Sequence, residues 1–145
     1  MEPWEVAARE EIRDLVARYN AKGDAGRFEE MLELFCEDAV LEVPRQPEMR
    51  GREAIRGLFE GVATRTGSGG GHRASYIRHF TATLQIDFDS PTDARGRAYY
   101  QVLTDHGLDH WGRYVDRYRL DGDRWRFADR RVSIDGAVPG GWADS

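Results

Sequence analysis

Residues 114–132 read Tyr-Val-Asp-Arg-Tyr-Arg-Leu-Asp-Gly-Asp-Arg-Trp-Arg-Phe-Ala-Asp-Arg-Arg-Val, and this stretch decides the fold. Two runs of strand-forming residues flank the triplet Asp121-Gly122-Asp123. Asp-Gly is strongly favoured in tight hairpin turns, because Gly adopts the positive φ that such turns need and Asp tolerates it better than most residues. The pattern predicts a long β-hairpin whose strands run over residues 110–120 and 124–134.

Two further strands are predicted before this hairpin. Residues 76–88 alternate in polarity, residues 90–93 form a turn, residues 94–103 form a strand and residues 104–109 a loop. Simple alternation places Phe80, Ala82, Leu84, Ile86 and Phe88 on one face of the strand, and His79, Thr81, Thr83, Gln85 and Asp87 on the other. The second half of the chain is therefore predicted to be four long antiparallel strands.

The first half of the chain is predicted to be mainly helical. Apolar residues recur at helical spacing in residues 5–22, 27–35 and 51–66, and a short apolar strand is predicted at residues 39–43. Helices on one face of an antiparallel sheet define the α+β class. We expect a cone-shaped, strongly curved antiparallel sheet that packs on three helices and encloses a pocket, and such pockets are mostly apolar with a few polar groups.

Composition narrows the possible classes of protein. The chain has 145 residues, of which 40% are hydrophobic and 32% charged, as expected for one globular domain. The net charge of −5 is spread over both signs and gives no indication of a nucleic-acid or membrane partner. We expect neither a signal peptide nor a membrane span, and hence a cytoplasmic protein. Cys36 is the only cysteine, so no intrachain disulfide forms, and a small buried hydrophobe in a helix is the expected role.

Several separated motifs, in order, resemble the SnoaL-like branch of the nuclear transport factor 2-like superfamily. They lie at residues 12–19, 24–28, 34–40, 49–55, 78–80, 112–118 and 125–127. The resemblance covers residues 5–134 and implies a single SnoaL-like domain over residues 1–145, with a C-terminal tail at 135–145. The fold that it implies hosts many chemistries, so function must be argued from the site.

Two residues of this resemblance carry a catalytic hypothesis. Scytalone dehydratase and hexachlorocyclohexane dehydrochlorinase, members of the branch, use an Asp–His pair as a base, and Asp24 and His79 stand at the matching positions. A carboxylate on the Nδ1–H of a histidine fixes the tautomer, raises the basicity of the ring and leaves Nε2 free to accept a proton. The resemblance therefore implies that His79 is the base and that Asp24 orients it.

The match to any single enzyme is partial. Scytalone dehydratase has a second histidine where this chain has Tyr100, and a tyrosine where this chain has Gly23. Ketosteroid isomerase has its base where this chain has Val43, although its oxyanion-hole tyrosine aligns with Tyr19. This chain thus lacks part of the apparatus of each relative.

The resemblance also implies a set of residues that bind the substrate. Arg130 and Arg131 are adjacent, so alternation sends them to opposite faces, and the resemblance favours Arg130 as the one that faces the pocket. The predicted substrate-binding residues are Tyr19, Tyr100, His110, Tyr114 and Arg130.

Each of these residues also has a simpler interpretation. Asp24 is equally suited to cap the second helix, where Asp is favoured, and His79 alternates onto the polar face of its strand, where a solvated side chain is usual. His106 and His110 are four residues apart, but that spacing suits a metal on a helix rather than in a loop, so we expect no metal site. The glycine-rich residues 67–71 are either a plain connection or a flap over the pocket.

The sequence favours a small, cofactor-independent enzyme. It would abstract a proton from a hydrophobic, oxygenated substrate of cyclic or polyketide type, leading to dehydration, elimination, isomerisation or cyclisation, with Tyr19, Tyr100 or Arg130 as the oxyanion partner. The alternatives are a non-catalytic ligand-binding or interaction domain and a structural protein like the small subunit of a ring-hydroxylating dioxygenase. We also expect a homodimer through the sheet, if its outer face carries Phe80 and Phe88, because large exposed apolar patches usually mark interfaces.

Overall fold

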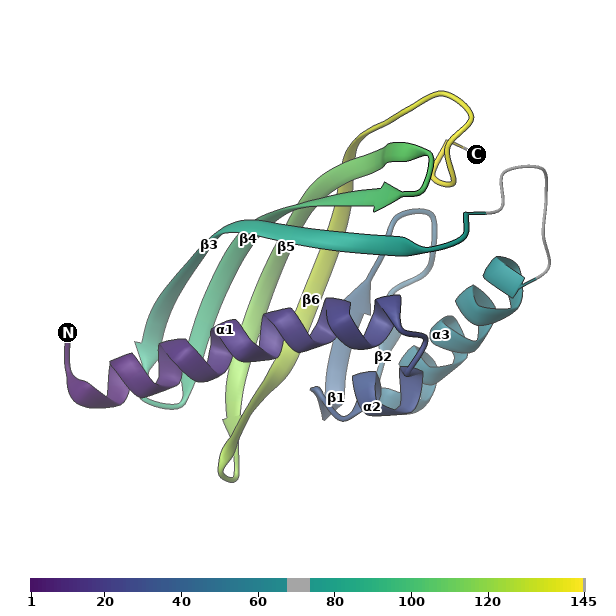
Figure 1. Cartoon of the computed structure of the whole chain (residues 1–145). Helices are drawn as coiled ribbons and strands as arrows, with labels where there is room; N and C mark the ends of the chain where they lie inside the picture. Colours follow the sequence, from purple (N-terminus) through teal and green to yellow (C-terminus); the bar gives the residue numbers. More distant parts are fainter. Residues whose placement is uncertain (68–73, 145) are drawn as a thin grey trace.

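The computed structural model describes residues 1–67 and 74–144, without the side chains of 63–67. Its elements are α1 (Pro3–Asp24), α2 (Phe28–Leu32), β1 (Phe35–Glu42), β2 (Met49–Arg50), α3 (Arg52–Gly67), β3 (Ile77–Ser90), β4 (Asp93–Thr104), β5 (Gly107–Asp121) and β6 (Arg124–Ala137). The strands form one sheet in the order β2-β1-β6-β5-β4-β3 (Figure 1). No helix in this described part has the length and apolar character of a membrane span.

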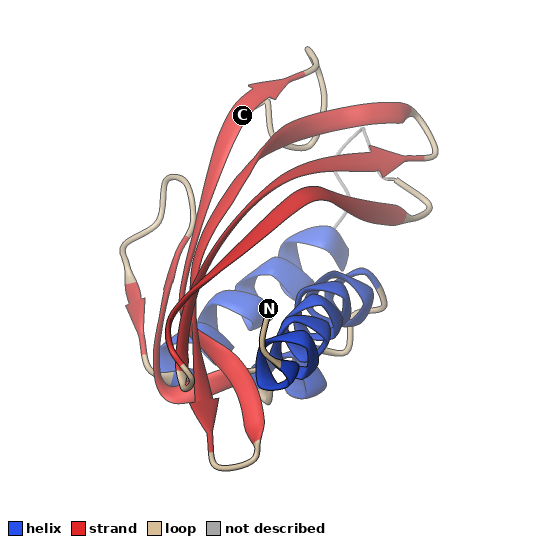
Figure 2. Ribbon diagram, turned by 90° about the vertical axis from the view of Figure 1, so that its left-hand side faces the viewer, coloured by secondary structure: helices blue, strands red, loops and turns tan. Residues whose placement is uncertain are grey.

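The sheet curves over the helices, which all lie on its concave side (Figure 2). The long strands β3 to β6 pair antiparallel with their neighbours, as predicted, whereas β1 runs parallel to β6. Side chains from α1, β1, α3 and β6 meet in the core, where Ile12, Phe35, Leu41, Ile55 and Phe127 have no exposed surface. The predicted α+β class and the curved sheet on three helices are confirmed.

Strand pairing shifts two predicted boundaries and adds one strand. The helix predicted at residues 27–35 ends at Leu32, because Phe35 pairs with Phe127 of β6 and Cys36 is buried in β1 rather than in a helix. The strand β2 was not predicted. The loop predicted at residues 104–109 is a tight turn at Asp105 and His106, so β4 and β5 continue almost to each other. The glycine-rich stretch falls largely outside the described residues, at 68–73.

The simple alternation predicted for residues 76–88 is wrong, because β3 contains a β-bulge. The register shifts between Ala82 and Gln85, where Thr83 adopts the unusual positive φ of 58°. An extra residue reverses the faces of a strand. Phe80 is therefore exposed on the outer face, whereas His79, before the bulge, shares the inner face with Phe88, after it.

Phe88 consequently contributes to the core and not to an outer patch. Its ring packs edge-on against Trp4 and Trp125, with ring centroids 5.2 and 5.8 Å apart. The bulge also brings His79 to the concave side, where the helices lie (Figure 2). The fold thus places on the inside a histidine that alternation alone assigned to the polar face.

Candidate functional site

A cavity of about 870 Å³ lies between the concave face of the sheet and the helices. This volume is within the range of small-molecule sites, and apolar side chains from α2, β1, α3 and β6 make up much of the wall. The polar or aromatic residues that line it are Tyr19, Asn20, Asp24, Phe28, Arg45, Gln46, Phe59, His79, Tyr100, His110, Tyr114 and Trp142. Four of the predicted substrate-binding residues and both predicted catalytic residues are among them.

Asp24 and His79 form the expected pair at this cavity. The His79 Nδ1 lies 2.6 Å from Asp24 Oδ1, and the backbone N–H of His79 donates to Asp24 Oδ2 at 2.8 Å. The side chains are 25% and 11% exposed, respectively. The two bonds hold the carboxylate against one residue, so that Nδ1 carries the proton and Nε2 is free to face the cavity. The contact is observed, while the catalytic role stays a prediction.

The helix-capping interpretation of Asp24 is wrong. Asp24 is the last residue of α1, and the N-cap position of α2 is Arg27. A carboxylate near the C-terminal end of a helix meets the negative end of the helix dipole, which is unfavourable. The hydrogen bonds from His79 offset this cost, so the position is explained by the pair and not by the helix.

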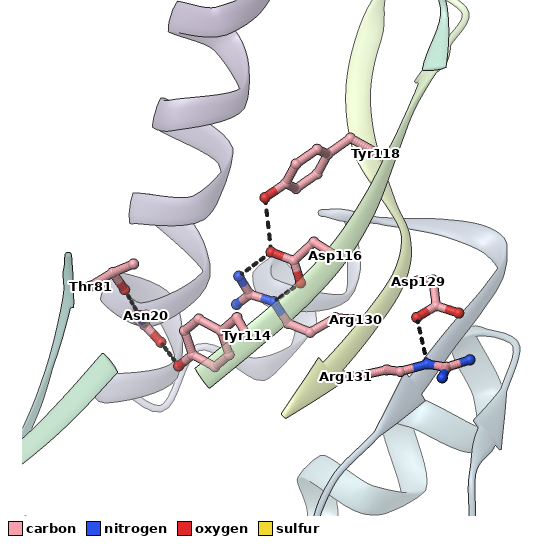
Figure 3. A network of polar contacts seen from close by, with 8 residues as sticks. All are labelled: Asn20, Thr81, Tyr114, Asp116, Tyr118, Asp129, Arg130 and Arg131. Carbon is pink, nitrogen blue, oxygen red and sulfur yellow. Dashed lines mark hydrogen bonds and ion pairs between the residues drawn. The ribbon is translucent and has the colours of Figure 1, made fainter. Parts of the chain in front are cut away.

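The hydroxyl groups of two predicted tyrosines are already engaged with the protein. Tyr100 donates to the backbone oxygen of Ser133 at 3.0 Å, and Tyr114 donates to Asn20 Oδ1 at 3.2 Å. Asn20 in turn donates to Thr81 Oγ1 at 2.8 Å, which ties α1 to β3 and β5 (Figure 3). Burial raises the pKa of Tyr100 to about 12, so its hydroxyl keeps its proton at neutral pH.

Tyr19 differs from these two tyrosines. Among the described side chains its hydroxyl donates to no acceptor, the Arg130 guanidinium lies beside its ring, and the residue lines the cavity. Burial raises the pKa of Tyr19, although the nearby Arg130 charge opposes the rise. Of the tyrosines predicted as oxyanion partners, Tyr19 is therefore the one whose O–H remains available to a ligand.

Arg130 is fully buried and is not among the residues that line the cavity. Its guanidinium donates to both oxygens of Asp116, at 2.8 and 2.9 Å, and Tyr118 donates to the same carboxylate at 2.8 Å (Figure 3). The rings of Tyr19, Tyr114 and Phe127 surround the guanidinium, with centroids 3.8–4.4 Å from its Cζ. Arg130 therefore stands behind the tyrosines of the cavity wall, and its predicted role in substrate binding stays a prediction.

Arg131 lies on the opposite face, as predicted for the adjacent pair. Its side chain is 60% exposed and lies 3.6 Å from Glu42 and 3.6 Å from Asp129, of which Figure 3 shows the contact with Asp129. Arg130 is on the inside because Ala128 is an extra residue in β6, so that Phe127 and Arg130 both face the core. The sequence shows the adjacent arginines but not this bulge.

His110 lines the cavity together with a partner that sequence reasoning missed. Its Nδ1 lies 2.8 Å from Asp109 Oδ2, and both side chains are almost fully buried. Neighbours in a regular strand point to opposite faces, but the register shifts at Asp109, which turns its side chain inward. The other oxygen of Asp109 accepts the backbone N–H of Trp142 at 2.8 Å, because the C-terminal tail folds back over β5. Trp142 and Ala143 thereby become part of the cavity wall.

No three His, Cys, Asp or Glu side chains gather as metal ligands within the described ranges. Asp109 and His110 bond to each other, and His106 lies on the turn outside the cavity. The polar or aromatic wall residues that were not predicted as site residues are Asn20, Phe28, Arg45, Gln46, Phe59 and Trp142. Asn20 directly follows the predicted residue Tyr19 in α1, and this adjacency was the one sequence feature that could have indicated Asn20 as a wall residue.

Comparison with known proteins supports this fold. A putative scytalone dehydratase from Novosphingobium aromaticivorans superimposes with a TM-score of 0.81 at 21% identity, covering 95% of this chain and 91% of that one. A hexachlorocyclohexane dehydrochlorinase from Novosphingobium barchaimii superimposes with a TM-score of 0.77 at 18% identity, and the superposition covers 94% of each chain.

The β subunit of a putative aromatic-ring-hydroxylating dioxygenase from N. aromaticivorans gives a TM-score of 0.74 at 21% identity, covering 92% of this chain and 93% of that one. At these identities the likeness shows the fold. No curated protein matches the sequence.

The sequence itself matches a family model. The model describes a SnoaL-like domain and matches residues 4–131, which include α1, the four long strands up to Arg131 and both members of the Asp24–His79 pair. The chain belongs to the SnoaL-like family.

Proposed function

We propose that this protein is a cofactor-independent enzyme that removes a proton from a carbon atom of a hydrophobic, oxygenated substrate. The observation that carries the proposal is the Asp24–His79 pair, with Nδ1 2.6 Å from the carboxylate, in the wall of a largely apolar cavity of about 870 Å³. The Nδ1–H donates to Asp24, so Nε2 has a lone pair that can take the proton. The electrons of the broken C–H bond then move into the substrate.

The negative charge that develops on the substrate needs a hydrogen-bond donor. Tyr19 has the available O–H in the cavity wall, and its raised pKa keeps that proton on the oxygen at neutral pH. Preorganised donors of this kind stabilise an oxyanion strongly in a site that excludes water. An enol or enolate can then proceed to elimination of water, to isomerisation or to ring closure, as the substrate dictates.

A non-catalytic ligand-binding domain is the second candidate. The same cavity would serve it, and the Asp24–His79 contact would then hold α1 against β3. The dioxygenase-like scaffold ranks third: the fold likeness favours it, but a scaffold has no need of a large cavity with charged pairs in its wall. The proposal includes a cytoplasmic location, which agrees with the free, buried Cys36.

Hydrogen exchange at carbon tests the proposal without knowledge of the substrate. The protein is incubated in D₂O with 2-tetralone and a set of related bicyclic ketones, and deuterium uptake at the α-carbon is followed by mass spectrometry. We expect at least one ketone to exchange faster with the wild type than with His79→Phe, by about 10²–10⁴-fold, the usual size of general-base catalysis.

The matched control is His106→Phe, which changes a histidine that is 64% exposed on the turn between β4 and β5. This variant should exchange the ketones like the wild type. Equal exchange by the wild type and His79→Phe across the set would contradict the assignment of His79 as the base.

The outer face of the sheet supports a second proposal, a homodimer. Phe80, Tyr99, Trp111 and Val115 are 37–57% exposed on neighbouring strands of this face. Burying such a patch against a second copy would remove apolar surface from water. Light scattering at micromolar concentration should give the mass of a dimer for the wild type, and a lower mass for Tyr99→Glu. A monomer mass for the wild type would count against the dimer.

A further inference from the structure

The cavity contains a second Asp–His pair in addition to Asp24–His79. The ring of Tyr100 lies between the two histidines, with its centroid 6.4 Å from that of His79 and 5.9 Å from that of His110. Asp109 holds His110 at Nδ1, as Asp24 holds His79. Both rings belong to the wall of one cavity, so a single ligand can contact both.

The hydrogen bond to Asp109 determines what His110 offers to a ligand. Burial lowers the pKa of His110 and outweighs the carboxylate of Asp109, which raises it, and the nearby His79 lowers it further. The imidazole is therefore neutral at neutral pH, and its one proton sits on Nδ1, where Asp109 accepts it. What remains toward the cavity is the lone pair on Nε2, which accepts hydrogen bonds and donates none.

The C-terminal tail keeps Asp109 in this orientation. Burial alone would raise the pKa of Asp109, but hydrogen bonds from the Trp142 N–H and from His110 lower it overall, so the carboxylate stays charged. The backbone oxygen of Asp109 also accepts the Val138 N–H at 2.9 Å. At Gly141 a Cβ atom would come within 2.9 Å of Asp109 Oδ1, so the tail fits tightly against the carboxylate.

Trp142 completes this arrangement. Its ring centroid lies 5.8 Å from that of His110, with the planes 32° apart, so the indole packs beside the imidazole. The same tail segment therefore holds the orienting carboxylate and supports one side of the ring. His110 is thereby held in one rotamer and one tautomer.

We propose that His110 accepts a hydrogen bond from a hydroxyl group of the ligand, and that the Asp109–His110 pair thereby selects hydroxylated cyclic molecules. The selection of hydroxylated molecules is argued from the Asp109–His110 pair. Only the identity of the selected molecule rests on the proposed function, because that molecule would be the one that presents its C–H bond to His79.

Two aromatic probes that differ only in a donor test the proposal. Binding of 2-naphthol and of 2-methoxynaphthalene is titrated by NMR, with the ring nitrogens of the histidines labelled with ¹⁵N. We expect the wild type to bind 2-naphthol about five- to tenfold more tightly, as one hydrogen bond of about 1 kcal/mol would give. The Nε2 resonance of His110 should shift with 2-naphthol and not with the methyl ether.

Variants assign the preference to one residue. His110→Phe retains a ring beside Trp142 but no acceptor, and should bind both probes equally. Its matched control, His106→Phe, should keep the preference. Asp109→Asn should lose the preference for 2-naphthol with the fold intact. The amide oxygen still accepts the Trp142 N–H, so the amide NH₂ faces Nδ1 of His110. Nδ1 must then accept a hydrogen bond, and the ring proton moves to Nε2.

Three results would overturn the proposal. One is a wild type that binds the probes equally or binds neither. The second is loss of the preference in His79→Phe and not in His110→Phe. The third is an Nε2–H tautomer for His110 in the free protein, which the ¹⁵N shifts report directly. None of these depends on turnover, so a failure of the exchange assay would refute the proposed reaction and leave this selection standing.

Discussion

The inner face of β5 contributes a carboxylate to each of two pairs, Asp116 with Arg130 of β6 and Asp109 with His110, and the two pairs lie in different surroundings. At one end Asp116 and Arg130 are 0% exposed and make two hydrogen bonds with each other inside a shell of rings. At the other end His110 and Asp109 are 6% and 8% exposed, and His110 borders the cavity. The same strand thus contributes a charge to the core and an acceptor to a binding site.

The difference lies in what is left unsatisfied. At the core end Asp116 and the faces of three aromatic rings surround the Arg130 guanidinium, and its Nη1, which has no hydrogen-bond partner among the described residues, is buried. At the cavity end each carboxylate uses its oxygens on one Nδ1 and one backbone N–H, and each imidazole keeps its Nε2. The core pair is enclosed by aromatic rings, whereas the two imidazoles belong to the cavity wall, where we propose that a ligand meets them.

The largest effect is expected at the core end. Arg130→Met leaves the buried Asp116 carboxylate without its cation and should lower the free energy of unfolding by about 3–5 kcal/mol, measured by urea denaturation. The double variant Asp116→Leu with Arg130→Met should recover much of this loss, because no buried charge is left unpaired. A stable Arg130→Met protein with an altered KM would instead make Arg130 a substrate-binding residue.

The next prediction separates the two carboxylates of the cavity. In Asp24→Asn the amide oxygen stays on the His79 N–H and the NH₂ faces Nδ1, so Nε2 gains the proton and His79 ceases to be a base. We expect kcat to fall by about 10²-fold or more on a ketone found by the exchange assay. Asp109→Asn should mainly raise KM for hydroxylated ketones. Equal losses of kcat in both variants would mean that the two pairs act as one unit.

Removal of the tail should change one pair and spare the other. A chain that stops after Ala137 lacks the Trp142 N–H and the indole that cover Asp109 and His110, whereas Asp24 and His79 make no hydrogen bond to the described residues 138–144. We expect the pKa of His110 to rise toward its ordinary value as water enters, while the ¹⁵N shifts of His79, which report its tautomer, change little. A comparable change at both histidines would show that the tail closes the whole cavity.

The smallest effect concerns pH and stability. The folded state lowers the pKa of His110, so below an ordinary value of about 6.5 the unfolded chain binds a proton that the folded chain resists. The contribution of neutral His110 is therefore complete above that pH and is lost as the pH falls, by at most about 1.4 kcal/mol per pH unit. Urea unfolding should give a free energy of unfolding that falls less between pH 7.5 and pH 5.5 in His110→Phe than in the wild type. In His106→Phe this fall should equal that of the wild type.

Local sequence was sufficient for most of the elements, and the family motifs were sufficient for the contact between Asp24 and His79. Apolar spacing predicted α1 and α3, and the Asp121-Gly122-Asp123 turn predicted the hairpin of β5 and β6, because turn geometry and periodic burial depend on neighbouring residues. Asp24 and His79 came from family motifs, and the contact between them lies where those motifs placed it.

Tertiary structure decided which way the side chains face. Extra residues at Thr83, Asp109 and Ala128 shift the strand register, and each shift reverses the alternation that the sequence predicts. This is why His79 lies inside, why Asp109 meets His110 and why Arg130 is sealed in the core. Pairing with distant strands fixes these bulges, and no short stretch of sequence contains that information.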